Sequence, residues 1–199
     1  VIYGESIYTS RWEVFGTYQL PLKELVLFQF SANEHDQNSV YGDTRYIADQ
    51  KIGFGQLTWD KKLAEKHDVF AGLTMRYTYY DDNTPATSTL DTVNSGNLPT
   101  RTYLPGIFIQ DEITFNAQNK ILVGMRYDYN SIHGNIFTPR INYKWNSENK
   151  KNILRLSAGT GYRVANVFTE DHAALSGARE VVLLSDLSPE TSYNGNINY

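Results

Sequence analysis

Hydrophobic and polar residues alternate with a period of two along most of the chain, which is typical of strands whose faces meet different surroundings. In residues 121–130, ILVGMRYDYN, one side carries Ile121, Val123 and Met125, and the other carries Arg126 and Asp128. The same pattern predicts strands at 11–20, 25–32, 69–80, 139–146 and 153–163, less regular strands at 46–59 and 106–116, and a last strand beginning near Ser192. The charged stretch 60–68 reads as a turn with at most one helical turn.

The connections between these strands alternate in length. The short ones are 21–24, 60–66, 116–120 and 146–152, and the longer ones are 33–45, 81–105, 130–137 and 164–190. In an antiparallel meander this order places short turns at one end and long loops at the other, as in outer-membrane barrels. We therefore predict an all-β, antiparallel, up-and-down meander of about eight or nine long strands, forming a curved part of a transmembrane β-barrel.

Aromatic residues mark both ends of the predicted apolar face. Tyr77, Tyr79, Tyr127 and Tyr129 lie near the long-loop end, and Tyr18, Trp59, Tyr143 and Trp145 lie near the short-turn end. Two aromatic girdles around an aliphatic band are typical of a surface that faces lipid. A piece of such a barrel has two unpaired edges, so we expect an open, curved sheet with a polar concave face.

Composition narrows the function classes. The net charge of −4 gives no indication of nucleic-acid binding, and the absence of cysteine excludes disulfides and thiolate metal sites. No run of about 18 apolar residues predicts a transmembrane helix. No Gly-x-Ser-x-Gly, His-Glu-x-x-His or Walker motif occurs, so we expect neither an enzyme nor a cofactor. Aromatic residues make up 14% of the chain and include 15 tyrosines, which suit boundaries between dry and wet surroundings.

Five phrases occur in the order in which one family carries them. They are LPGIFIQDE (104–112), VGMRYDY (123–129), HGNIFTPRINYKW (133–145), RLSAGTGYRVANVFTED (155–171) and LSPETSYNGNINY (187–199). Together they resemble TonB-dependent outer-membrane receptors, particularly those of Bacteroidetes type. One departure is local: where many members read Arg-Ala-Pro, this chain has Arg163, Val164 and Ala165.

The resemblance implies a Gram-negative outer-membrane barrel of about 22 strands with a plugged lumen. It implies import of a scarce solute such as a siderophore, cobalamin, a metal ion or an oligosaccharide. The implied partners are outer-membrane lipid, a small-molecule or metal-chelate substrate, and the TonB complex acting through a plug and its TonB box. We expect residues 1–199 to be a partial barrel domain without signal peptide or plug. Two alternatives stay open, a soluble carbohydrate-binding β module and a passive porin-like barrel.

Two groups of residues are candidates for function. Predicted ligand-capturing residues of the extracellular loops are His35, Asp36, Asp81, Asp82, His133, Glu170, Asp171 and His172. Solvated loop charge and turn chemistry explain the acidic ones at least as well, so no metal site is predicted. Predicted lumen residues that face the plug are Arg126, Asp128, Arg140, Arg155 and Arg163. For Arg126 and Asp128, pairing within the barrel wall is the alternative to holding a plug.

Overall fold

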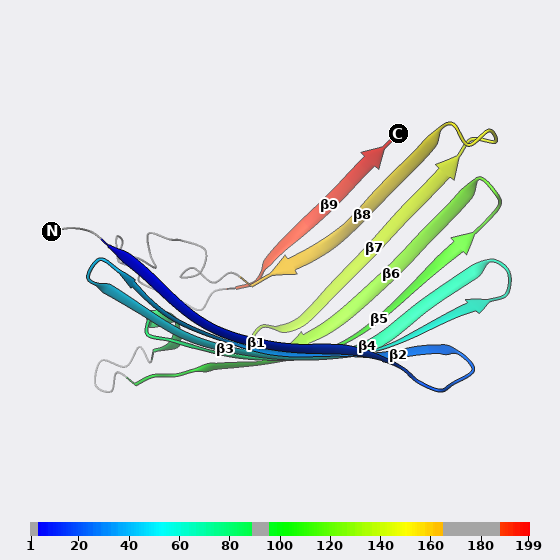
Figure 1. Ribbon diagram of the computed structural model, residues 1–199. Helices are drawn as coiled ribbons and strands as arrows, with labels where there is room; N and C mark the ends of the chain where they lie inside the picture. The colour runs from blue at the N-terminus through cyan, green and yellow to red at the C-terminus, as the bar shows by residue number, and fades with distance from the viewer. Residues whose placement is uncertain (1–3, 89–95, 165–187) are drawn as a thin grey trace.

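The computed structural model describes residues 4–88, 96–164 and 188–199, and it forms one antiparallel sheet of nine strands in the order β1 to β9 (Figure 1). The strands are β1 (Glu5–Gln19), β2 (Leu25–Tyr41), β3 (Thr44–Leu63), β4 (His67–Asp82), β5 (Thr100–Thr114), β6 (Asn119–Asn130), β7 (Gly134–Asn146), β8 (Ile153–Arg163) and β9 (Glu190–Asn198). A short 3₁₀ turn, η1 (Pro85–Thr87), follows β4. The predicted all-β meander is confirmed, because each strand pairs with the next one along the chain.

Two of the four predicted long loops are wrong. Residues 33–45 are not a loop: β2 and β3 continue through them and meet at a turn of Gly42 and Asp43. Residues 130–137 likewise reduce to a turn at 131–133 between β6 and β7. The other two connections, 83–99 and 164–189, are long. The four connections at the opposite end are all short, and Figure 1 shows them together at one end of the strands.

The extended hairpin of β2 and β3 explains the first wrong prediction. The two strands have 17 and 20 residues, whereas about 9–11 residues suffice for a strand to cross a bilayer. Beyond the apolar band both faces of the hairpin carry polar residues, so the alternation that identifies a strand in the sequence disappears. The polar stretch NEHDQN therefore resembles a loop in the sequence although it is paired strand.

Local chemistry sets the tight turns. Gly42 and Gly134 have φ of 61° and 79°, a region that glycine enters without the steric cost of a side chain. The side-chain oxygen of Asn130 accepts hydrogen bonds from the backbone N–H groups of Ile132 and His133, at 2.9 and 3.2 Å. Asparagine is a common turn residue for this reason.

The two faces of the sheet differ in chemistry, as alternation along each strand predicts. The convex face carries aliphatic and aromatic side chains that are largely exposed, among them Phe28, Leu57, Leu73, Ile107, Met125, Ile141 and Leu156. In the register, Phe28, Leu57, Leu73 and Ile107 lie side by side across β2 to β5. The concave face is mostly polar. A single layer has little interior, and the buried hydrophobic cluster consists of Tyr41, Tyr46 and Ala48.

The predicted aromatic residues all lie on the convex face, and several have their polar atoms hydrogen-bonded. The Trp59 indole N–H donates to Glu24, whose carboxylate also accepts from Lys61. The Tyr143 hydroxyl donates to Asn119 at 2.5 Å, and the Tyr127 hydroxyl donates to Asn135 at 2.7 Å. In the described part of the chain, no helix has the length and apolar character needed to cross a membrane.

Candidate functional site

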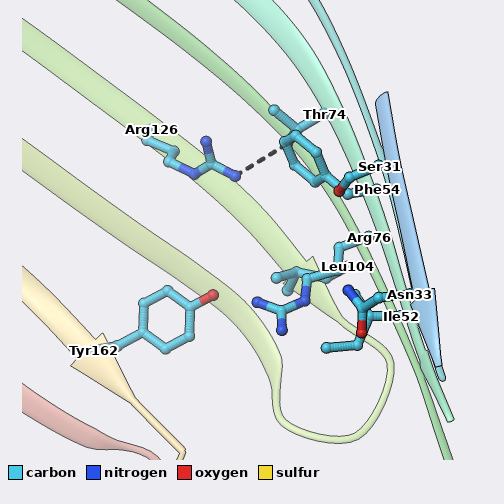
Figure 2. Close-up of a pocket in the computed structure, with 9 residues that line it drawn as sticks. All are labelled: Ser31, Asn33, Ile52, Phe54, Thr74, Arg76, Leu104, Arg126 and Tyr162. Carbon is cyan, nitrogen blue, oxygen red and sulfur yellow. Dashed lines mark hydrogen bonds between the residues drawn. The ribbon is translucent and has the colours of Figure 1, made fainter. Parts of the chain in front are cut away.

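A hollow of about 490 Å³ lies on the concave face, where side chains from six strands point toward one another (Figure 2). We call it the concave hollow, and its lining residues are Ser31, Asn33, Ile52, Phe54, Thr74, Arg76, Leu104, Arg126 and Tyr162. The guanidinium groups of Arg76 and Arg126 and the ring of Tyr162 all reach into it. Strands as far apart as β2 and β8 contribute because the sheet curves. The guanidinium of Arg76, together with several hydroxyl and amide groups, makes the hollow suited to a polar or anionic occupant.

Arg126 and Asp128 pair within the wall, beside the hollow. The Nε and Nη2 atoms of Arg126 donate to the two carboxylate oxygens of Asp128, each at 2.6 Å. The Asp128 side chain is 1% exposed, and Nη2 of Arg126 also donates to the Thr74 hydroxyl at 2.9 Å. This bidentate geometry is the strong form of an arginine–carboxylate contact. Both carboxylate oxygens of Asp128 are therefore hydrogen-bonded within the wall.

Gly106 makes room for this pair. A Cβ atom at position 106 would lie 2.0 Å from Oδ1 of Asp128 and 2.7 Å from the Thr74 hydroxyl. The guanidinium carbon of Arg126 also lies 5.8 Å from the ring centre of Phe108, its cross-strand partner on β5. The roles of Thr74 and Gly106 could not be predicted from the sequence, because their contacts join strands that are far apart in the chain.

Arg140 and Arg155 also lie on the concave face, and the surroundings of Arg140, Arg155 and Arg163 differ. Arg140 donates to Gln110, and the absence of a side chain at Gly124 leaves room for Arg140. Arg163 forms an ion pair with Glu190 at 3.0 Å. Arg155 is exposed and makes no ion pair within the described residues. The group predicted as one set therefore divides into paired and unpaired cations.

His35 and Asp36 lie within strand β2 rather than at a loop tip, so the structure contradicts their predicted location. They point to opposite faces, His35 to the concave face opposite Gln50 and Asp36 to the convex face opposite Asp49. The Nδ1 atom of His35 is buried without a hydrogen-bond partner in the described structure. Two residues on opposite faces of one sheet cannot bind the same small ligand.

Asp82 is buried and engaged, which makes it a structural residue rather than a free ligand-binding carboxylate. Its Oδ1 atom accepts from the hydroxyl groups of Thr84 and Thr87, at 2.8 and 3.0 Å. Its Oδ2 atom accepts from the Tyr80 hydroxyl at 2.7 Å, and the Tyr80 and Tyr46 hydroxyls are 2.9 Å apart. Burial, followed by the hydrogen bonds with Asp82 and Tyr46, raises the pKa of Tyr80. The network fixes the start of the connection that follows β4.

Asp81 and His133 lie toward the long-connection end, as predicted. Asp81 accepts a hydrogen bond from the amide of Asn97 at 2.9 Å, and its other oxygen is buried without a partner in the described structure. His133 sits in the turn before β7. Glu170, Asp171 and His172 lie outside the described residues. Among the described residues, the register places Asp36 and Asp81 on either side of Asp49 on the convex face, whereas His35 and Asp82 lie on the concave face.

One acidic group was missed by sequence reasoning. Carboxylate oxygens of Glu34, Asp36 and Asp49 lie within 4.8 Å of one another on the convex side of the β2–β3 hairpin. The ammonium of Lys51 contacts Glu34 at 2.8 Å and Asp49 at 3.1 Å and so counters part of the charge. Hydrogen bonds from Lys51 and then from Trp12 lower the pKa of Glu34. Because the stretch was interpreted as a loop, its cross-strand contacts could not be predicted.

Comparison with known proteins fixes the family. Residues 6–199 match the family model described as TonB dependent receptor-like, beta-barrel. The chain belongs to the TonB-dependent receptor family. This membership places it in the outer membrane, in agreement with the resemblance found in the sequence.

Two kinds of relative agree with this assignment. The iron-regulated outer membrane virulence protein of Vibrio cholerae is 29% identical over 111 residues, covering 53% of this chain and 17% of that protein. The siderophore receptor PirA of Acinetobacter baumannii superposes with a TM-score of 0.67 at 14% identity, over 97% of this chain and 32% of PirA. The chain thus spans less than a third of the length of these proteins.

Two other solved structures share the fold. A mutant of the ferric enterobactin receptor PfeA of Pseudomonas aeruginosa gives a TM-score of 0.63 at 11% identity, over 84% of this chain and 27% of PfeA. The RagAB peptide transporter gives 0.55 at 18% identity, over 98% of this chain and 28% of that chain. Identities this low show a common fold and leave the solute open.

Proposed function

We propose that residues 1–199 form part of the barrel wall of a receptor that actively imports a scarce solute across the outer membrane, with energy supplied through the TonB complex. The observation that carries the proposal is the family match over residues 6–199, together with a sheet whose concave face is polar. The convex face supports contact with lipid, since its aliphatic side chains stay exposed between aromatic residues. A soluble sandwich would need a second layer to cover that face.

A ferric chelate is the first solute class to test. The Vibrio cholerae relative is named as iron-regulated, and the guanidinium of Arg76 reaches into the concave hollow, where it suits the anionic oxygens of a chelate. Asp81, His133 and the stretch that contains Glu170, Asp171 and His172 remain candidates for first contact at the outer rim. His35 and Asp36 do not act together in this proposal, and Asp82 holds the rim in shape.

Growth and uptake measurements test the proposal. The complete gene is deleted, and cells are limited for iron and supplied with a panel of radiolabelled ferric chelates. We expect one chelate to support growth only when the gene and a working TonB complex are both present. Arg76→Ala should weaken chelate binding about tenfold, the loss of one charge-assisted contact. Uptake that persists in cells without TonB would overturn the proposal of active import. Uptake of a different solute would show that the transported solute is not a ferric chelate.

A further inference from the structure

Three carboxylates form a row on the convex face, near the long-connection end of the sheet. Asp36 of β2, Asp49 of β3 and Asp81 of β4 are direct cross-strand neighbours in the register. Carboxylate oxygens of Glu34, Asp36 and Asp49 lie within 4.8 Å of one another. Like charges in direct cross-strand positions destabilise a sheet. A positive charge bound beside the row would remove this cost.

Two oxygens of this row are buried without a partner. The Oδ1 atoms of Asp49 and Asp81 are both shielded from solvent, and neither accepts a hydrogen bond in the described structure. A buried oxygen that has lost its water and gained no donor carries the full cost of desolvation. Such an atom in a folded protein points to a water or an ion that satisfies it. The same feature on two directly opposed carboxylates favours one cation between them.

The donors around the row serve its other oxygens. The ammonium of Lys51 contacts Glu34 at 2.8 Å and the Oδ2 atom of Asp49 at 3.1 Å. The amide of Asn97 donates to the Oδ2 atom of Asp81 at 2.9 Å. One ammonium beside four carboxylates leaves the group with a net negative charge. Neither donor reaches the two buried Oδ1 atoms.

A cavity of about 580 Å³ lies beside these two carboxylates, and both Asp49 and Asp81 line it. Ser88 and Asn97, which pair across the connection that follows β4, line it as well. Calcium binds carboxylate, amide and water oxygens at about 2.3–2.6 Å in flexible geometry, whereas magnesium demands a nearly ideal octahedron. The cavity therefore combines space for a hydrated ion with the oxygen ligands that calcium accepts.

We propose that Asp49 and Asp81 bind a calcium ion at the outer rim, with Glu34 and Asp36 adding negative charge from the side of β2. The ion joins the carboxylate of β3 to that of β4 where β4 ends, and so it stabilises the start of the connection 83–99. Asp49 and Asp81 lie on the convex face, whereas the concave hollow lies on the other face. Calcium binding is therefore separate from any solute contact in the hollow.

Calorimetric titration of the complete receptor with calcium chloride tests the site, after a chelator has removed bound metal. We expect Asp49→Asn and Asp81→Asn each to weaken calcium binding about tenfold, because each removes one charged ligand. The double variant should bind one equivalent fewer than the unmodified receptor. The control, Asp43→Asn in the exposed β2–β3 turn, removes the same charge from the same hairpin and should leave binding unchanged. Equal stoichiometry and affinity in the double variant and the unmodified receptor would overturn the proposal.

Thermal unfolding of the same receptors gives a second measurement. With chelator present, both single variants should unfold at a higher temperature than the unmodified receptor, because each removes one of two opposed like charges. With calcium present this order should reverse, since the ion stabilises the receptor that binds it. Stabilisation of the unmodified receptor by mild acid but not by calcium would assign a shared proton to the two carboxylates and overturn the proposal. Uptake that does not depend on TonB would change neither measurement, so calcium binding and active import fail separately.

Discussion

Arg126 holds Asp128 through two hydrogen bonds of 2.6 Å, and the Asp128 side chain is almost completely buried. The two residues are neighbours on the same face of β6, and Thr74 extends their contact to β4. The sequence left open whether this pair stabilises the wall or holds a plug. Each carboxylate oxygen already accepts from Arg126, so the pair is satisfied within β6, and the hydrogen bond from Arg126 to Thr74 connects it to β4.

Because Arg126 and Asp128 differ in exposure, we expect their substitutions to cost different amounts of unfolding free energy. Arg126→Ala leaves a buried, unpaired carboxylate and should cost about 3–5 kcal/mol of unfolding free energy. Asp128→Ala leaves an arginine that is 36% exposed and can reach water, so it should cost about 1–3 kcal/mol. The double variant should cost less than the sum of the two. Urea unfolding of the complete receptor in lipid vesicles measures all three. Equal and additive costs would contradict the pairing.

Gly106 should be intolerant of even one methyl group. In Gly106→Ala the new carbon would fall 2.0 Å from Oδ1 of Asp128, so the ion pair must move. We expect a loss of about 2–4 kcal/mol, within the range for overpacking and a broken buried pair. The control is Gly53→Ala on β3, where a Cβ atom meets nothing within 4 Å. Heat-dependent gel mobility, which distinguishes folded from unfolded barrel, gives the unfolding temperature of each variant. Similar unfolding temperatures would count against a special role for Gly106.

The strands and their faces could be predicted from the sequence only where hydrophobic and polar residues alternate with a period of two. Within the apolar band one face meets apolar surroundings and the other polar ones, so Met125 and Arg126 could be assigned to opposite faces. Above the band both faces are polar, and His35 and Asp36 looked like loop residues although they are paired in β2. Alternation in the sequence predicts which face of the sheet a residue lies on. The residue beside it on the next strand is known only from the strand pairing.

The candidate site shows the same division. The concave position of Arg126, Arg140 and Arg155 follows from alternation alone. Whether each arginine side chain has a hydrogen-bond partner depends on the register. The register brings Gln110 to Arg140 as a partner, but it brings another cation, Lys144, to Arg155. No short sequence stretch contains that information, because the partners are 11 to 30 residues apart. The length of a long connection such as 83–99 does not specify the register of the strands that it joins.

Asp82 and Thr87 should control the order of the connection that follows β4. The Thr87 hydroxyl donates to the backbone oxygen of Asp82 at 2.6 Å and accepts from its backbone N–H at 3.0 Å. Thr87→Val removes both contacts and leaves buried groups unsatisfied. This should lower the free energy of local opening by about 1–3 kcal/mol. Amide hydrogen exchange between Asp82 and Ser88 should become about tenfold faster, while global stability changes little. Asp43→Ala, in the exposed β2–β3 turn, should leave this exchange unchanged.

The two faces of β2 should differ in how much stability they lose when the same positive charge is added. Phe28 lies on the convex face, is 41% exposed and stacks on Phe30, whereas its neighbour Gln29 lies on the concave face. If the convex face meets lipid, Phe28→Arg places a cation in hydrocarbon and should cost about 2–4 kcal/mol. Gln29→Arg loses one hydrogen bond with Gln56 and should cost about 1 kcal/mol.

Folding of the complete receptor into phospholipid vesicles across a urea series measures this difference. Vesicles with thinner bilayers should reduce the cost of Phe28→Arg, because the charged group then lies closer to an interface. The cost of Gln29→Arg should not depend on bilayer thickness, since a concave side chain does not meet lipid. If both variants lose equal stability in every bilayer, the convex face is covered by protein rather than lipid, and the assignment of the two faces is wrong.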